Sequence, residues 1–218
     1  MALDIKPGNI VAVLSGKAKA TTSEAWSRAL DTVWPQQQAV LRAQKGFIDC
    51  KALWNIENNQ EILVLAYWNS LVERLAYEKS AAARPRALME TTLQGPPPRP
   101  KFEVLQSRGA GLDRIKEGHI VAIMSAKSRA PTRDEYAREI ARIWDKATRP
   151  LETQKGFLSA QVLYNIEGTR LAHVMGFWAT LEQRLAYEGS ISRQVRGPFE
   201  SITESPYPRP KYVVVKSM

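Results

Sequence analysis

The sequence is poor in the residues that cross-link or metallate small proteins. Cys50 is its one cysteine, and His119 and His173 are its two histidines, in a chain of 218 residues. A lone cysteine excludes an internal disulfide, and so few soft ligands do not make a zinc or iron–sulfur site. We therefore expect no metal, and a reducing cytoplasm suits this cysteine usage.

Long apolar runs are also missing. The first residues, MALDIKPGN, lack the run of roughly seven apolar residues that is typical of a signal peptide. No later run approaches the ~20 apolar residues that a membrane-spanning helix needs. We therefore expect a cytoplasmic protein with no membrane partner.

Basic residues outnumber acidic ones, 31 against 22, and the formal net charge is +9. Such an excess can favour nucleic acid, because binding releases counterions from the phosphates. Here the basic residues are spread along the chain, so a solvated surface is the simpler interpretation. The run ILVLAYWN also lacks the basic and aromatic pattern with which RNA-recognition domains stack bases. We expect no nucleic-acid partner.

What the sequence does contain is one unit written twice. The stretch QKGFIDCKALWNIENNQEILVLAYWNSLVERLAYEKS, residues 44–80, returns as QKGFLSAQVLYNIEGTRLAHVMGFWATLEQRLAYEGS, residues 154–190. The offset of 110 positions continues without a gap from Gly8 and Gly118 to Ser107 and Ser217. A period of this length suits a small domain. We predict two domains, residues 1–109 and 110–218.

Each copy predicts the same order of elements, two helices among four strands. In the first copy Pro35 should stop or kink the first helix, and Asn58 and Asn59 mark a hairpin. The pattern predicts strands at 10–14, 47–56, 62–68 and 102–105, with helices beginning at Thr22 and Ser70. This βαββαβ order is ferredoxin-like.

The third strand of each copy is apolar on both faces. In the first copy Ile62, Val64 and Ala66 alternate with Leu63 and Leu65. A sheet covered by helices on one face alone would not need this pattern. We therefore expect an α+β fold in which two ferredoxin-like βαββαβ repeats close an intramolecular dimeric α/β barrel. The protein would be a monomer with pseudo-dimeric halves or a further homodimer.

The repeated residues resemble those of a known family, the antibiotic biosynthesis monooxygenase domains of the dimeric α/β-barrel superfamily. Its single-domain members form the barrel by homodimerising, so the resemblance implies that a tandem chain forms it internally. The resemblance rests on Gly46, Phe47, Trp68, Ser70, Ala76, Tyr77 and Ser80, which return as Gly156, Phe157, Trp178, Thr180, Ala186, Tyr187 and Ser190.

The resemblance implies a monooxygenase-like protein that works without metal or flavin on a hydrophobic aromatic or polyketide-type small molecule. The substrate would bind as a phenolate and supply the electron to dioxygen itself. Two alternatives stay open, a haem-binding or haem-degrading protein and a non-catalytic protein that binds a small molecule. Haem-degrading relatives use an Asn, a Trp and a helical His; this chain has Asn9 and Trp68, but Tyr77 replaces the His. A tyrosinate can ligate haem iron, yet the substitution weakens the haem reading.

Four aromatic residues are the candidate catalytic residues. Trp68 and Trp178 end a strand where pockets of this fold family open, and an indole can wall a pocket and donate one hydrogen bond. Tyr77 and Tyr187 could donate a hydrogen bond or a proton to a phenolate. Core packing explains all four residues as well.

Four polar residues are the candidate substrate ligands. Arg74 and Arg184 could hold an anion, although a Glu four residues later makes a surface ion pair the simpler interpretation. Asn9 and His119 occupy matching positions before the first strand of each copy, where Asn offers a hydrogen bond and His a proton acceptor. Both could equally lie at an exposed strand end. His173 should point away from Trp178, into the barrel, as a core histidine.

Overall fold

The computed structural model describes residues 3–58 and 60–218. Asn59, half of the expected hairpin signal, lies outside the described residues. The strands are β1 (Ile10–Lys17), β2 (Phe47–Asn55), β3 (Glu61–Trp68), β4 (Lys101–Gly109), β5 (Ile120–Lys127), β6 (Phe157–Asn165), β7 (Leu171–Trp178) and β8 (Lys211–Ser217). The α-helices are α1 (Ser23–Arg42), α2 (Leu71–Ser80), α3 (Ala83–Glu90), α4 (Arg133–Thr148), α5 (Leu181–Glu188) and α6 (Ser192–Ser201).

The described strands form one closed antiparallel barrel, in the order β1-β3-β2-β8-β5-β7-β6-β4. The last strand of each half joins the two halves. β4 pairs with β1 over three residues and then with β6, while β8 pairs with β5 and with β2. The expected α+β class is therefore confirmed, and the barrel closes only because both halves contribute strands.

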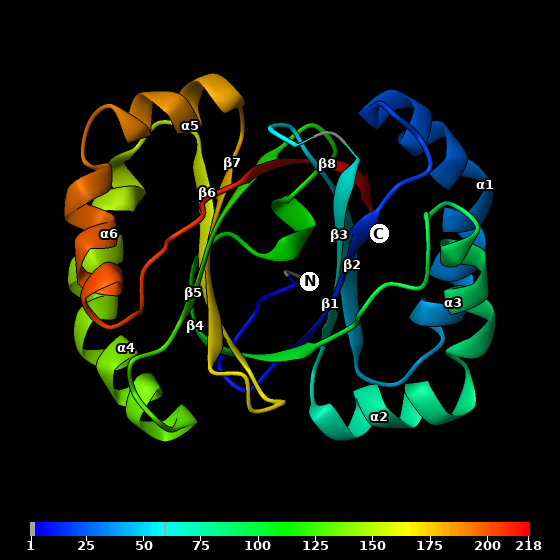
Figure 1. The fold of residues 1–218 in the computed structure, drawn as a ribbon, viewed down its shortest axis with the longest axis horizontal. Helices are drawn as coiled ribbons and strands as arrows, with labels where there is room; N and C mark the ends of the chain where they lie inside the picture. Colours follow the sequence, from blue (N-terminus) through cyan, green and yellow to red (C-terminus); the bar gives the residue numbers. More distant parts are fainter. Residues whose placement is uncertain (1–2, 59) are drawn as a thin grey trace.

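The helices cover two opposite sides of this barrel, with α1, α2 and α3 on one side and α4, α5 and α6 on the other (Figure 1). Three apolar clusters result. Leu65 and Tyr67 of β3 join the cluster inside the barrel, whereas Val64 and Trp68 of the same strand join the cluster beneath α1 and α3. The third cluster lies beneath α4 and α6. Alternate residues of a strand face opposite sides, so both faces must be apolar.

The helix starts follow the expected capping chemistry. Thr22 Oγ1 accepts a hydrogen bond of 3.2 Å from the backbone N–H of Ala25. Thr132 Oγ1 accepts one of 3.3 Å from the N–H of Glu135 and donates one to its carboxylate, as in a capping box. The apolar face of each of these two helices, α1 and α4, is buried.

Of the two outcomes expected at Pro35, a stop is excluded. α1 continues to Arg42, because Gln37 and Leu41 beyond the proline are buried against the rest of the first half. The second helix ends at Ser80, before Pro85, and Pro85 lies in the first turn of a separate helix, α3, where a missing N–H costs little. Each half therefore carries one more helix than predicted, in the order βαββααβ.

The inside of the barrel also holds a few polar side chains. Asp49 and Lys51, both fully buried, form an ion pair of 2.6 Å between Oδ2 and Nζ. The Tyr67 hydroxyl donates a hydrogen bond of 3.2 Å to Gln161 Oε1. His173 points inward as expected, with its ring 4.5 Å from that of Phe102. The barrel interior is thus packed, and open space must be sought outside it.

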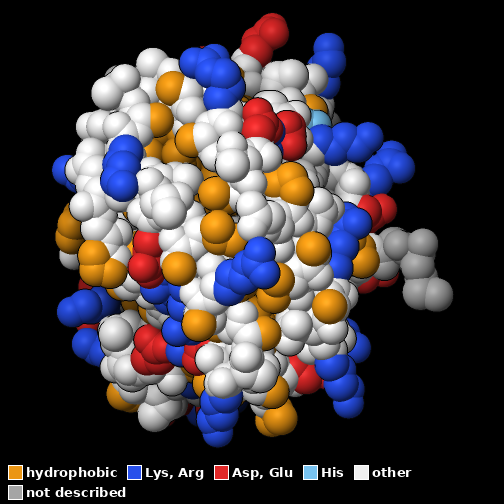
Figure 2. All heavy atoms as spheres, turned by 90° about the vertical axis from the view of Figure 1, so that its right-hand side faces the viewer, with side chains coloured by type: hydrophobic (Ala, Val, Ile, Leu, Met, Phe, Trp, Pro, Cys, Tyr) orange, Lys and Arg blue, Asp and Glu red, His pale blue; other side chains and the backbone are white. Residues whose placement is uncertain are grey.

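On the face formed by α1, α2 and α3, lysine and arginine side chains are scattered among acidic and apolar ones (Figure 2). No described helix combines the length and the apolar character that crossing a bilayer requires.

Candidate functional site

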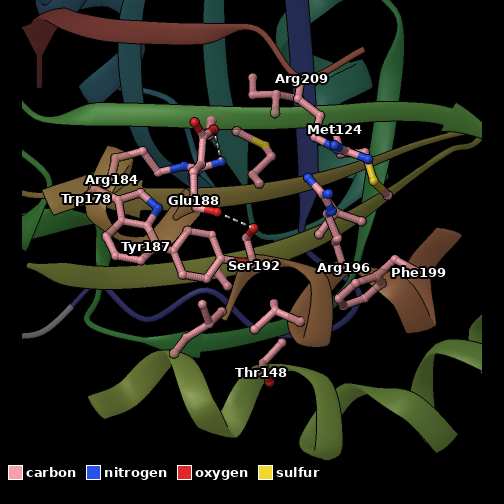
Figure 3. A pocket seen from close by; sticks show the side chains of 18 residues that line it. Met124, Thr148, Trp178, Arg184, Tyr187, Glu188, Ser192, Arg196, Phe199 and Arg209 are labelled. Atoms are coloured by element: carbon pink, nitrogen blue, oxygen red, sulfur yellow. Dashed lines mark hydrogen bonds and ion pairs between the residues drawn. The ribbon is translucent and has the colours of Figure 1, made fainter. Parts of the chain in front are cut away.

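Each half has a cavity between the barrel wall and its helices. The C-cavity, of about 660 Å³ up to its open mouth, is lined among others by Trp178, Arg184, Tyr187, Ser192, Phe199 and Arg209 (Figure 3). The N-cavity, of about 550 Å³, is lined among others by Trp68, Arg74, Tyr77, Arg86, Met89 and Arg99. The repeat therefore places the same kind of site twice.

The tryptophan that ends β3 or β7 forms one wall of each cavity. Trp68 is fully buried, with its ring 5.0 Å from that of Tyr77 in a stacked arrangement. In the second half the rings of Trp178 and Tyr187 are 4.8 Å apart. The structure thus brings the four aromatic candidates together as two pairs. Their side chains serve packing, and they also face the open space.

The helix after each strand positions an arginine over this aromatic pair. Ser70 caps α2 by accepting a hydrogen bond of 3.3 Å from the N–H of Glu73. Arg74 and Tyr77, three residues apart, then share one face of the helix. The guanidinium carbon of Arg74 lies 5.5 Å from the ring centre of Trp68 and 5.1 Å from that of Tyr77, within range of a cation–π contact.

The second half repeats this geometry, and in both halves the arginine is buried. Arg184 lies 5.7 Å from the ring centre of Trp178 and 4.9 Å from that of Tyr187. Arg74 and Arg184 are only 4% and 6% exposed, although each pairs with a glutamate one turn later, at 3.0 Å and 3.1 Å. The expected ion pairs form, but their arginines are buried and do not lie on the surface. Burial lowers the pKa of both guanidinium groups.

These arginines keep donors that nothing in the described chain accepts. Nε and Nη1 of Arg74 and of Arg184 are buried without a hydrogen-bond partner, and so is Trp68 Nε1. An unmatched buried donor is costly, because it has lost water and gained nothing. A bound oxygen anion would satisfy these donors.

The two tyrosines remain neutral at physiological pH. Burial raises the pKa of Tyr187 to about 12, against the opposing effect of Arg184. Burial also raises the pKa of Tyr77. Each hydroxyl keeps its proton and can therefore donate a hydrogen bond.

Four further arginines line the cavities, and the sequence analysis missed them. Arg86 of α3 and Arg99 return as Arg196 of α6 and Arg209. Their repetition at the 110-residue offset was the signal that could have found them. In the first half Arg86 pairs with Glu78 at 3.2 Å, Arg99 pairs with Glu90 at 2.7 Å, and Lys101 lies 3.7 Å from Glu78.

The charges around each cavity do not cancel. In the first half three arginines and Lys101 pair with Glu78, Glu90 and Glu167, which leaves one positive charge over. The second half repeats this set: Lys211 pairs with Glu57 at 2.6 Å and with Glu188 at 3.5 Å, and Arg196 and Arg209 pair with Glu200. A positive, largely apolar cavity favours an anionic ligand.

Asn9 and His119 do not line either cavity. Asn9 Oδ1 accepts a hydrogen bond of 2.9 Å from the N–H of Lys6, and its amide donates one of 3.2 Å to the carbonyl of Asn69. His119 Nδ1 accepts one of 3.1 Å from the N–H of Lys116, and burial lowers its pKa. Both side chains hold the turn before their strand, so this geometry does not support a role in substrate binding.

No cluster of histidine, cysteine, aspartate and glutamate that could hold a metal ion occurs in residues 3–58 and 60–218. Cys50 lines the N-cavity, where burial raises the pKa of its thiol.

No protein-family model and no curated protein matches the sequence. Solved structures do match. They include a provisionally assigned monooxygenase from Fusobacterium nucleatum (TM-score 0.69, 11% identity, covering 98% of this chain and 95% of that one). An anthrone oxidase-like protein has a TM-score of 0.64 at 10% identity and covers 100% and 95%. A ferredoxin-fold protein related to antibiotic biosynthesis monooxygenases, from Listeria monocytogenes, has a TM-score of 0.55 at 12% identity and covers 96% and 95%.

A heme-degrading enzyme from Listeria monocytogenes is also similar, with a TM-score of 0.50 at 14% identity over 94% of this chain and 99% of that one. At such identities the likeness shows the fold. The chain has the fold of monooxygenase-like, ferredoxin-fold proteins related to the antibiotic biosynthesis monooxygenases, as the sequence resemblance implies.

Proposed function

We propose that this protein is a monooxygenase-like enzyme that oxidises a hydrophobic aromatic molecule, bound as a phenolate, without metal or flavin. The observation that carries the proposal is the buried arginine over a Trp–Tyr pair in each cavity, with two guanidinium donors left unmatched. The likeness to an anthrone oxidase-like protein supports the same substrate class.

The cavity suits such an anion for two physical reasons. Its apolar walls exclude water, and preorganised donors in a dry site stabilise a developing negative charge far better than water-exposed ones. Arg184 can pair with the phenolate oxygen, while the neutral hydroxyl of Tyr187 and the indole of Trp178 face the same space (Figure 3). Ionising the phenol makes it electron-rich enough to reduce dioxygen.

The reaction balances without a further reductant. For an anthrone-type substrate, dioxygen converts the ring methylene into a carbonyl group: two C–H bonds break and one C=O forms. One oxygen atom enters the product, and the other leaves as water with the two hydrogens. All four electrons come from the substrate.

We further propose that residues 1–109 and 110–218 are two ferredoxin-like domains that correspond to the two subunits of a dimeric α/β barrel. The exchange of β4 and β8 between the halves supports this view. In this arrangement each half contributes one cavity.

Oxygen uptake with 1,8-dihydroxyanthrone tests the function. The purified protein should accelerate uptake, and R74M/R184M should lower kcat by roughly 10²–10³-fold, the usual effect of removing a donor to a developing oxyanion. The matched control R84M/R193M also removes two arginines, both exposed, from α3 and α6. It should keep the activity. Equal loss in both double variants, or no uptake by the wild type, refutes the proposal.

Haem binding is the second candidate, favoured by the likeness to a heme-degrading enzyme. The arginines would suit the haem propionates. The helical residue in the place of an iron ligand fits less well, because a tyrosinate is needed and burial raises the pKa of Tyr187 to about 12. Titration of the protein with haemin decides between the candidates: a saturable shift of the Soret band favours haem. A small molecule that binds tightly without oxygen uptake indicates a non-catalytic binding protein.

A further inference from the structure

The two cavities differ at the position beneath their tryptophan. Ala66 of β3 lines the N-cavity, and Gly176 takes its place in the C-cavity. A Cβ added at Gly176 would lie 3.2 Å from Trp178 Nε1, tighter than an ordinary contact. A methyl group at this position would crowd the indole nitrogen.

The state of the two indole nitrogens follows this difference. Trp68 Nε1, beside the residue that carries the methyl group, is fully buried and has no acceptor. Trp178 Nε1 has no acceptor in the described chain either, but unlike Trp68 Nε1 this atom is not fully buried. Figure 3 shows this nitrogen on the ring edge that faces the other lining side chains. Only the second half thus presents an indole donor to a ligand.

The neighbouring strand changes in the same direction. Cys50 pairs with Ala66 in the first half, and Ala160 pairs with Gly176 in the second. Both residues of the second pair are smaller, so the floor of the C-cavity lies deeper beneath its tryptophan.

We propose that the C-cavity is the ligand-binding and reacting site and that the N-cavity, whose indole N–H is covered, is not, with Gly176 as the residue that determines the difference. In the C-cavity a ligand oxygen would accept hydrogen bonds from Trp178 Nε1 and from the free donors of Arg184. In the N-cavity the methyl of Ala66 and the thiol of Cys50 fill the corresponding space. The substrate class rests on the function proposed above, but the location of the site does not.

Isothermal titration calorimetry with 2-hydroxy-1,4-naphthoquinone tests this inference. The probe is an oxygen anion on an aromatic frame at neutral pH, and it is already oxidised, so binding is measured without turnover. The wild type should bind one molecule per chain. G176A should weaken binding about tenfold, since it covers the N–H of Trp178 and costs about one hydrogen bond. W178F, which keeps an aromatic ring at this position and loses the donor, should weaken it by a similar factor.

The reciprocal variant A66G should open the first half and raise the stoichiometry to two. G176A is expected to fold, because the matching strand carries Ala66 in the same place; equal far-UV circular dichroism checks this. Two equal sites in the wild type, no binding, unchanged affinity in G176A, or a stoichiometry that stays at one in A66G would each overturn the inference. A single site that G176A weakens, in a protein that takes up no oxygen with the anthrone, would retain the inference and refute the proposed function.

Discussion

The half-buried histidine inside the barrel predicts a specific loss of stability in acid. His173 Nδ1 lies 2.8 Å from the hydroxyl oxygen of Ser125, and the ring packs on Phe102. Burial is the one cause that lowers its pKa from 6.5 to about 4. Between these two pH values the imidazole of His173 is protonated in the unfolded chain and largely neutral in the folded chain. The free energy of unfolding must therefore fall as the pH falls through this window.

The size of the loss follows from the two pKa values. Linkage gives about 2 kcal/mol at pH 5 and about 3 kcal/mol at pH 4. A domain is typically stable by roughly 5–15 kcal/mol, so one side chain would remove a measurable share.

The first half supplies the matched variant, because Leu63 stands where the second half has His173 and Ser15 stands opposite it as Ser125 does. His173→Leu should unfold in urea with nearly the wild-type free energy at pH 7. At pH 4 to 5 it should exceed the wild type by about 2–3 kcal/mol. Other titrating groups cancel in this difference. Parallel stability curves for the two proteins between pH 7 and pH 4 would refute the reasoning.

Two further predictions concern the fold. Lys51→Gln should lower the free energy of unfolding by about 3–5 kcal/mol, because it leaves Asp49 buried without its partner. The double variant D49S/K51Q, which copies the matching residues of the second half, should recover most of this free energy in urea unfolding. Equal losses in the single and double variants would contradict the ion-pair argument. Gly46→Ala should lower the melting temperature more than Gly8→Ala. Both glycines have positive φ, a conformation that costs alanine about 1 kcal/mol. A Cβ at Gly46 would also lie 2.8 Å from Glu73 Cβ, whereas a Cβ at Gly8 meets nothing within 4 Å. Equal melting temperatures would show that the contact with Glu73 relaxes freely.

The sequence predicted the strands and the α+β class because these depend on period and polarity, which are local properties. It failed where tertiary packing overrides a local rule. α1 passes Pro35 because residues beyond it are buried, and α3 is a helix that the pattern did not predict. A surface ion pair is the simpler expectation for Arg74, because an arginine four residues before a glutamate gives the same sequence pattern on an exposed helix and on a buried one. Only the placement of α2 over the end of β3 shows that this arginine is buried.

The repeat hides the difference that bears most directly on function. Alignment of the two copies shows alanine facing glycine at 66 and 176, a change that by itself suggests only a slightly weaker strand. Its meaning depends on a distance, 3.2 Å from the missing Cβ to an indole nitrogen. Since the arginines are duplicated and this methyl is not, charge alone would make the two cavities equal binders. Access to the Trp178 N–H is what would make the two cavities unequal, and a ligand that formed no hydrogen bond with this donor would bind in both cavities.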